Sequence, residues 1–212
     1  MLTPDFFQRD VLTVARELIG VELMWHGSSG IIVETEAYAV EGDEASHTAS
    51  RPSAREFVKQ NPPGAAYVYF NYGMYWLFNL LVKGGSKDGL ILIRALEPVS
   101  GIEEMKRRRK KDTARDLCNG PGKLALAMGI TGTDHGTLMC GRGRPSGVGL
   151  RLPRTGLAHE VSEDVRVGIS KAADFPWRFL ACHHPDVSVA YGKVKVHQPN
   201  QRKKSRTRKP GA

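Results

Sequence analysis

The chain has 212 residues, of which 41% are hydrophobic, and this length and apolar content suit one domain with a core of its own. It contains no run of about 18 apolar residues, and its first ten residues lack the basic-then-apolar order of a signal peptide, which argues against a membrane protein and a secreted one. The net charge of +9 suits a polyanionic partner, and three cysteines without Cys-x-x-Cys spacing argue for a reducing compartment and against a disulfide frame or a metal site.

The first forty residues predict one helix and one β-hairpin. Asp10 is a suitable N-cap for a helix over residues 11–19, where apolar residues recur at helical spacing. Residues 21–25 and 30–38 alternate in the manner of strands, and the polar residues 26–29 predict the turn that joins them.

A long polar segment then precedes an aromatic hairpin. Residues 39–64 contain Gly, Pro and Ser throughout, which predicts a long loop with one short helical piece. Residues 65–79 alternate on both sides of Asn71-Tyr72-Gly73, and this pattern predicts two strands joined by a tight turn. Tyr72 at the tip would forfeit a burial free energy of ~1.5–3 kcal/mol. An aromatic ring exposed in this way usually has another use, such as a wedge between base pairs.

The second half predicts short strands and two more helices. Ser100 and Glu103 would form a capping box for one helix. The Gly-Pro-Gly start of the other leaves free N–H groups beside Lys123, which could hold a phosphate or simply begin a helix. Hairpins with interspersed helices, without regular β-α alternation, indicate an α+β fold: a mostly antiparallel, curved sheet surrounded by several short helices. The predicted helices are 101–111 and 123–128, and the predicted strands are 90–96, 148–152, 165–169 and 177–182.

Positive charge is gathered into two runs. Residues 106–111 are six consecutive basic residues, and residues 199–212 hold six more without an acid, so that the net charge without this tail is +3. Patches of this kind suit a nucleic acid, although a solvated helix end or a solubilising tail is the alternative for each. We expect a single domain over 1–198 and a disordered basic tail over 199–212.

Two acidic residues lie on one face of a predicted strand. Alternation places Glu34, Glu36 and Tyr38 on the same side. A salt bridge or a turn cap is one interpretation. A sugar hydrolase with two carboxylates is another, but side chains at i and i+2 would lie roughly 6–7 Å apart side by side and would not flank a bond. A single acid that activates water is the simpler chemistry.

These residues belong to longer motifs that resemble the alkyladenine (3-methyladenine, methylpurine) DNA glycosylases. The resemblance runs in order from about Asp10 to Ser188, and several long motifs in the right order are more specific than any one of them. The motifs are Val33-Glu34-Thr35-Glu36-Ala37-Tyr38, Asp43-Glu44-Ala45-Ser46-His47, Tyr67-Val68-Tyr69-Phe70-Asn71-Tyr72-Gly73-Met74-Tyr75, Leu92-Ile93-Arg94-Ala95-Leu96-Glu97-Pro98 and Leu117-Cys118-Asn119-Gly120-Pro121-Gly122-Lys123-Leu124.

The resemblance implies a DNA repair enzyme that flips a damaged purine out of the duplex, hydrolyses its N-glycosidic bond and leaves an abasic site. Extrusion comes first, because a base inside the stack cannot be attacked. Glu36 matches the general base that deprotonates the attacking water. Arg94 matches a residue that orients this water and contacts the backbone phosphate. Tyr72 matches the intercalating tyrosine that fills the gap left by the base.

The resemblance also implies the walls of a base pocket. Tyr38, His47 and Tyr69 match the residues that enclose the flipped base, where stacking on an aromatic face is worth ~1–3 kcal/mol. Asn79 matches a residue that abuts the purine edge and disfavours guanine, whose exocyclic amino group would clash. Leu92 would line the pocket floor, although a leucine in a strand is more often core.

The implied partner is double-stranded DNA that contains damaged purines, and the implied protein is a monomer that needs no cofactor. Arg51 and Arg55 lie in the segment with which relatives contact DNA. No lysine stands at position 36 or 72, which disfavours a lyase and favours a monofunctional glycosylase. A bacterial protein of this kind would work in the cytoplasm or nucleoid, and a eukaryotic one in the nucleus. The alternatives are a non-catalytic DNA- or RNA-binding module and a hydrolase of free sugars or nucleosides.

Overall fold

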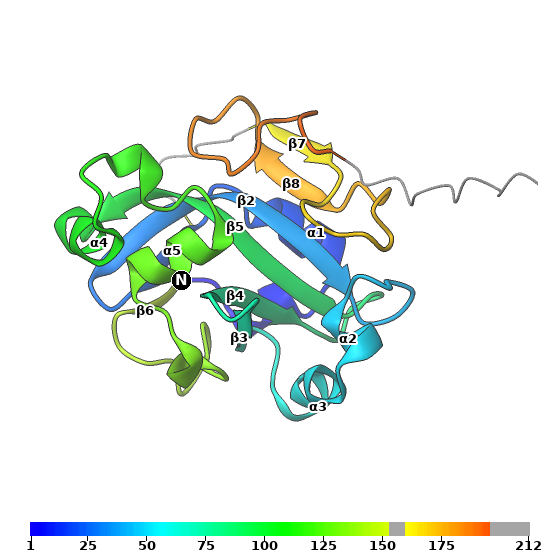
Figure 1. Cartoon of the computed structure of the whole chain (residues 1–212). Coiled ribbons are helices and arrows are strands. Elements are labelled where there is room, and N and C mark those ends of the chain that lie inside the picture. Colours follow the sequence, from blue (N-terminus) through cyan, green and yellow to red (C-terminus); the bar gives the residue numbers. More distant parts are fainter. Residues whose placement is uncertain (153–159, 196–212) are drawn as a thin grey trace, which may run out of the picture.

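The centre of the computed structural model is a curved antiparallel sheet (Figure 1). The structure describes residues 1–152 and 160–195, and the predicted basic tail lies outside them. Within the described residues the strands follow the order β3-β4-β5-β2-β1-β6, and β8 joins β2 and carries β7. The strands are β1 Glu22–Trp25, β2 Ser28–Ala39, β3 Ala66–Asn71, β4 Tyr75–Val82, β5 Gly89–Ser100, β6 Val148–Arg151, β7 Val161–Asp164 and β8 Arg178–Ala181.

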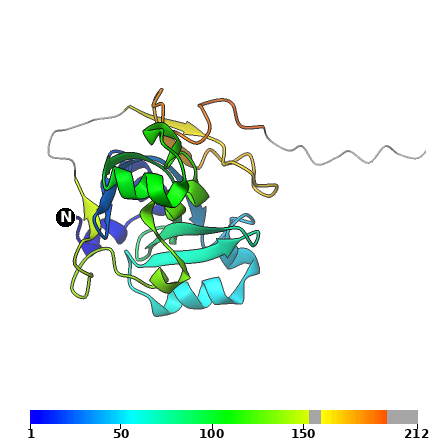
Figure 2. The ribbon, with the colours of Figure 1, turned by 60° about the vertical axis from the view of Figure 1, so that its left-hand side comes forward.

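Short helices cover the sheet on both sides, which confirms the predicted α+β class (Figures 1 and 2). Helix α1 packs on β2 and β5, α5 packs on β4 and β5, and α4 lies against α5. Helix α3 packs beside the hairpin of β3 and β4, where Phe57 and Val58 meet Tyr67 and Leu81. The α-helices are α1 Val11–Glu17, α2 His47–Ser50, α3 Pro52–Gln60, α4 Ile102–Arg109 and α5 Pro121–Met128, and the 3-10 helices are η1 Pro4–Phe7, η2 Ala114–Asp116 and η3 Gly132–Asp134.

Strand β2 connects the two parts of the sheet. One edge of β2 pairs with β5 along nearly the whole length of β2. The other edge of β2 pairs first with β1 and then, from Glu34 to Glu36, with β8. The register with β5 shifts on both sides of Glu34. Such irregularities re-aim side chains next to functional sites. Thr35 faces α1 and donates a hydrogen bond to the carbonyl of Ala15, so Glu34 and Glu36 point to the opposite face, as the alternation predicts.

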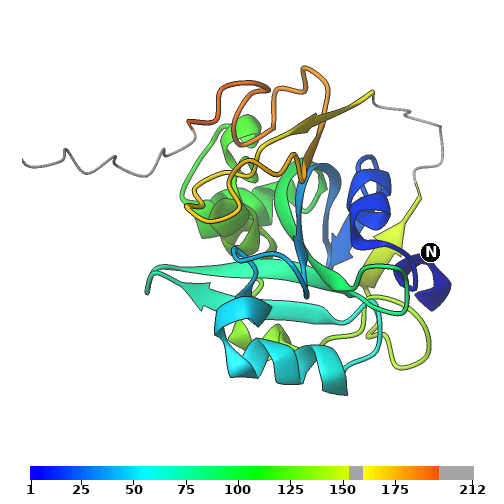
Figure 3. The same ribbon diagram turned by 90° about the vertical axis from the view of Figure 1, so that its right-hand side faces the viewer.

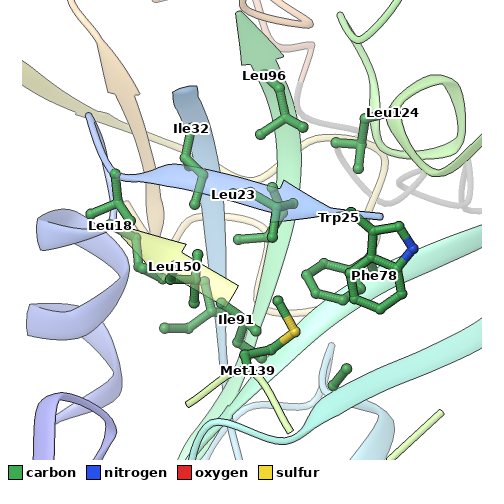
Figure 4. Packing of buried hydrophobic residues seen from close by; sticks show 14 of the residues in the cluster. Leu18, Leu23, Trp25, Ile32, Phe78, Ile91, Leu96, Leu124, Met139 and Leu150 are labelled. Carbon is green, nitrogen blue, oxygen red and sulfur yellow. The ribbon is translucent and has the colours of Figure 1, made fainter. Parts of the chain in front are cut away.

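The main core lies between the sheet and α1, α4 and α5 (Figure 4). Trp25 of β1 and Phe78 of β4 meet edge to face, with ring centroids 5.7 Å apart. Aromatic pairs of this geometry add about 0.5–1.5 kcal/mol to the burial of their surface. This core fixes β4 and β5 and therefore the base of the aromatic hairpin.

Three helix predictions need correction. Asp10 caps α1 through the N–H groups of Leu12 and Thr13, as expected, but the helix already ends at Glu17. Residues 39–64, predicted as a long loop with one short helical piece, contain two helices, α2 and α3. The capping box at Ser100 is wrong: β5 runs through Ser100, whose hydroxyl hydrogen-bonds Ser29, and Gly101 precedes α4 with a φ of 73°.

Two further predictions fail in the C-terminal part. Residues 165–169 are not a strand, because Gly168 has a φ of 73° and the N–H of Val167 donates to a side chain of β2 instead of a neighbouring strand. The adjacent strand β7 escaped prediction because its sequence, Val-Ser-Glu-Asp, is polar and short. No helix in 1–152 or 160–195 is long and apolar enough to span a bilayer.

Candidate active site

A surface pocket with a volume of about 530 Å³ opens between the end of β2, the α2 helix, the β3–β4 hairpin and the loop 167–171. Figure 3 shows the hairpin and this loop projecting on the same side of the molecule. The volume lies in the range of ordinary small-molecule sites. The pocket brings together eight residues from the sequence prediction: Tyr38, His47, Arg51, Tyr69, Tyr72, Asn79, Leu92 and Arg94.

Glu36 lies behind the wall of this pocket. It is 0% exposed and is not itself one of the lining residues, although its three hydrogen-bond partners are. Its Oε1 accepts from the N–H of Val167 at 2.6 Å, and its Oε2 accepts from the hydroxyl of Tyr38 at 2.7 Å and from Arg94 at 3.2 Å. Each carboxylate oxygen has about two acceptor sites. Among the described residues Oε1 accepts one hydrogen bond, so that one of its acceptor positions is open to a further donor.

Arg94 bridges the two acids of β2. Its Nε donates to Glu34 at 3.1 Å, Nη1 to Glu36 at 3.2 Å, and Nη2 to the hydroxyl of Ser188 at 3.1 Å. Burial alone would lower the pKa of Arg94, but Glu36 and Glu34 raise it above its ordinary value. Arg94 therefore stays a cation. A salt bridge was one interpretation of the two acids on this strand, and Arg94 forms it with both of them. Arg94 also lines the pocket.

Glu34 belongs to the supporting structure. It is fully buried and accepts a second ion pair from Arg178 of β8 at 2.8 Å, and Arg178 also pairs with Asp164 of β7 at 2.6 Å. Buried charges are tolerated only when they are paired and hydrogen-bonded in this way. Glu34 and Glu36 thus have different surroundings, although they are two residues apart on one strand face.

The three aromatic walls differ in their polar contacts. Burial and the nearby Glu36 carboxylate raise the pKa of Tyr38 well above its ordinary value. Tyr38 therefore stays protonated, and its hydroxyl donates a hydrogen bond to Glu36. The rings of His47 and Tyr69 lie 4.2 Å apart, and the Nδ1 of His47 hydrogen-bonds the hydroxyl of Tyr67 at 3.2 Å. Burial, and then Arg51, lower the pKa of His47 to about 4. Its imidazole is therefore neutral near pH 7.

Asn79 and Leu92 form the part of the wall contributed by the sheet. They face each other across the β4–β5 pair, and both are almost completely buried. The side-chain amide of Asn79 donates to the carbonyl of Tyr67 at 3.0 Å, which fixes its orientation. Asn79 therefore presents its remaining polar edge in one direction only.

Tyr72 lies at the tip of the hairpin, as predicted. It is 85% exposed and adopts a φ of 49°, a left-handed conformation that is uncommon outside glycine. Met74, next to it, is also exposed. The ring of Tyr72 forms part of the pocket rim and otherwise points into solvent.

The predicted phosphate contacts do not converge on the pocket. Arg51 lines it, with its guanidinium 5.7 Å from the centre of the Tyr69 ring. Arg55 donates to the carbonyl of Thr48 at 2.6 Å and is not one of the lining residues. Lys123, at the start of α5, donates to Asn119 at 2.8 Å, so the amino group is already bound within the chain.

Sequence reasoning missed the loop that closes the far side of the pocket. Val167 supplies a backbone donor to Glu36, and the side chain of Arg166 next to it is fully buried against Asp43 of the segment that follows β2. The signal was an arginine between two valines, since a buried arginine requires an acidic partner. That partner lies 123 residues away, and spacing alone does not identify it.

Comparison with known proteins places this site in a family. A model of the methylpurine-DNA glycosylases matches residues 5–185. The chain belongs to the methylpurine-DNA glycosylase family. Proteins of this family act in the repair of DNA that carries alkylated purines, and the resemblance stated from the motifs is thereby confirmed.

Relatives in bacteria match over most of their length. A protein of Rhodopseudomonas palustris is 44% identical over 179 residues, which cover 84% of each chain, and one of Agrobacterium fabrum is 46% identical over 175 residues, which cover 82% of this chain and 86% of the relative. A Granulibacter bethesdensis protein is 43% identical over 187 residues, 87% of this chain and 86% of its own. Each carries the name "Putative 3-methyladenine DNA glycosylase".

Proposed function

We propose that this glycosylase everts one alkylated purine from duplex DNA into the pocket and hydrolyses its N-glycosidic bond with water activated by Glu36. The observation that carries the proposal is the arrangement of the pocket: aromatic walls stand in front of one buried, hydrogen-bonded carboxylate, with an exposed tyrosine at the rim. The family supplies the reaction class, and the arrangement of the pocket supports our assignment of parts of the reaction to residues.

Tyr72 acts first, as a wedge. Its ring enters the base stack at the point where the damaged nucleotide leaves, and it offsets part of the lost stacking. The hairpin tip suits this part, because Tyr72 is 85% exposed and its ring is accessible before DNA binds. Of the predicted phosphate contacts, the arrangement supports Arg51, which lines the pocket, because Arg55 and Lys123 are bound to other groups within the chain.

The everted base lies between Tyr38 on one side and His47 with Tyr69 on the other. An alkylated purine with a positive charge stacks well on the electron-rich faces of these rings. Because the depressed pKa of His47 keeps the imidazole neutral near pH 7, it does not repel such a cation. Asn79 meets the edge of the purine and disfavours guanine, whose exocyclic amino group clashes there, and Leu92 forms the floor.

The chemical step needs one acid–base residue for a cationic lesion. A water molecule held on Oε1 of Glu36 attacks C1′ of the sugar and transfers a proton to the carboxylate. The bond between C1′ and the purine nitrogen breaks, and its electron pair neutralises the positive charge of the leaving base. Arg94 and the Tyr38 hydroxyl hold Oε2, so that the carboxylate keeps one orientation. A neutral lesion such as hypoxanthine additionally requires protonation of the leaving base.

The experiment that tests this function measures free bases released from a panel of duplexes, each with one 3-methyladenine, 7-methylguanine, hypoxanthine or ethenoadenine. We expect release of at least one alkylated purine and an abasic strand that breaks only on treatment with alkali. Strand cleavage without alkali would assign a lyase activity, for which Lys171, a lining residue of the pocket, offers an amine. Release of none of the four bases would contradict the proposal.

A further inference from the structure

The fully buried guanidinium of Arg166 lies behind the pocket, in the connection between β7 and β8. Its Nη1 and Nη2 donate to the two carboxylate oxygens of Asp43 at 2.6 and 2.9 Å. Its central carbon lies 4.7 Å from the centre of the Tyr38 ring and 5.2 Å from that of Trp177. The cation is therefore clamped at its edge by an acid and stacked between two rings.

Both oxygens of Glu36 are held by groups that this guanidinium fixes. Tyr38, on which Arg166 stacks, donates its hydroxyl to Oε2 at 2.7 Å. Val167, the next residue along the chain, donates its N–H to Oε1 at 2.6 Å. Nη1 of Arg166 also donates to the carbonyl of Ala37 at 2.9 Å, and this bond joins the loop to the backbone of β2 between Glu36 and Tyr38.

The same ion pair shapes a third part of the wall. Asp43 accepts hydrogen bonds from the N–H groups of Ala39 at 3.2 Å and Ala45 at 3.1 Å. These bonds fold the segment between β2 and α2, which brings His47 to the pocket. One guanidinium thus joins the end of β2, the start of α2 and the loop 165–171.

Only arginine combines these contacts. Its planar group has a fork of donors for a carboxylate and two faces for aromatic rings, whereas a lysine ammonium is a compact point charge. Among the described residues the Nε of Arg166 is a buried donor without an acceptor. The contacts with Asp43, Tyr38 and Trp177 hold the side chain in this orientation, although its Nε–H has no acceptor there.

We propose that Arg166 is a positioning residue for base excision: it holds Tyr38 and the N–H of Val167 against Glu36 and thereby sets the direction in which this carboxylate meets the attacking water. The inference rests on the proposed role of Glu36. It adds that the reaction depends on a side chain that touches neither the DNA nor the water.

The test is a double-mutant cycle on the single-turnover rate of 3-methyladenine release. Arg166→Lys keeps a positive charge beside Asp43 but loses the fork and the flat stack. We expect it to lower the rate about tenfold to a hundredfold, the scale of a small misplacement of a reacting group. The dissociation constant for a duplex with a tetrahydrofuran abasic-site analogue should stay within about threefold of the wild-type value, because the wedge and the rim are unchanged. Introduced into Glu36→Gln, the same substitution should cost no further rate, since nothing remains to be positioned.

The matched control is Arg151→Lys, which alters an arginine–carboxylate pair with Glu22 away from the pocket and should leave the rate unchanged. An unchanged rate in Arg166→Lys, or an equal loss of rate with and without Glu36, would overturn the inference. The proposed function would still hold in that case, provided that the wild-type protein releases the base. If Arg166→Lys does not fold, Trp177→Leu decides the question. It frees one face of the guanidinium without unpairing a charge, and it should lower the rate only where Glu36 is present; any other result overturns the inference.

Discussion

At the scale of single residues, the site is a cluster of charges that neutralise one another away from water. Glu34 and Glu36 are completely buried, and Arg94 and Arg178 pair with them from neighbouring strands. Removal of one partner from such a pair leaves a buried charge uncompensated and costs about 3–5 kcal/mol of stability. The cluster therefore gives Glu36 a fixed direction, and it makes most substitutions inside it unsuitable as clean tests of catalysis.

His47 offers a test that depends on pH. Its pKa falls from 6.5 to about 4 on folding, because burial and Arg51 disfavour the imidazolium. Between these two values the unfolded chain binds more protons, so His47 makes the free energy of unfolding rise with pH through this window and adds no slope above it. Urea unfolding from pH 4 to 7.5 should show that the difference between the wild type and His47→Phe changes only below about pH 6.5. A constant difference across the whole range would contradict the depressed pKa.

At the scale of elements, the hairpin of β3 and β4 has a fixed base and a free tip. Gly122 at the start of α5 lies so close to Tyr75 that an added Cβ would meet its ring carbon at 2.8 Å. This contact joins the helix to the first residue of β4, while a Cβ added at Gly73 would meet no atom of the described residues within 4 Å beyond its chain neighbours. In the proposed mechanism the tip enters the base stack while the strands behind it stay in place.

Tyr72→Ser tests the wedge. Loss of one stacking ring should weaken binding to a duplex with an abasic-site analogue by about 1–3 kcal/mol, which is roughly fivefold to 150-fold. Tyr191→Ser removes another exposed tyrosine, one that does not line the pocket, and serves as the control that should bind like the wild type. Gel-shift titrations measure both constants. Equal affinity of Tyr72→Ser and Tyr191→Ser would exclude intercalation by Tyr72.

The sequence predicts those elements whose signal is local. Alternation over 30–38 places Glu34 and Glu36 on one face, and the aromatic alternation around Tyr72 predicts the hairpin and its exposed tip. The resemblance of the motifs adds His47 and Arg94, which local patterns do not single out. The structure places all of these residues in or directly behind one pocket.

The remaining parts depend on contacts between distant segments. The pair of Arg166 with Asp43 spans 123 residues, and the N–H of Val167 reaches Glu36 across 131. The segment around Arg166 alternates like a strand, but burial of the guanidinium and the positive φ of Gly168 make it a loop. Strand propensity predicts neither the buried guanidinium nor the loop, because contacts between distant segments decide both.

At the scale of the whole molecule, the distribution of positive charge differs from the first impression of the sequence. In the run 106–111, Lys106 pairs with Glu103, Arg107 and Arg108 pair with Glu104, and Arg109 donates to the carbonyl of Leu117. This run is largely the last turn of α4, bound to acids of its own helix and to neighbouring carbonyls. Two carboxylates therefore offset part of the six positive charges of this run, and the tail 199–212 adds six further basic residues without an acid in its sequence.

Deletion of residues 199–212 should make DNA binding less sensitive to salt. Each basic residue that contacts a phosphate contributes about 0.9 to the slope of log affinity against log salt concentration. Fluorescence titrations with undamaged duplex between 50 and 300 mM salt, a range chosen about the physiological value, measure this slope. A full-length chain with its six basic tail residues replaced by glutamine separates charge from length. A slope that neither change alters would show that the tail contacts no phosphate.

The central claim concerns the carboxylate behind the pocket, and Glu36→Gln tests it most directly. The amide has the same size and leaves the rim and Tyr72 unchanged, so binding to a duplex with an abasic-site analogue should persist. It cannot accept the proton of the attacking water, and release of 3-methyladenine in single turnover should fall by about 10²–10⁴-fold. Release at the wild-type rate by folded Glu36→Gln protein would contradict the account.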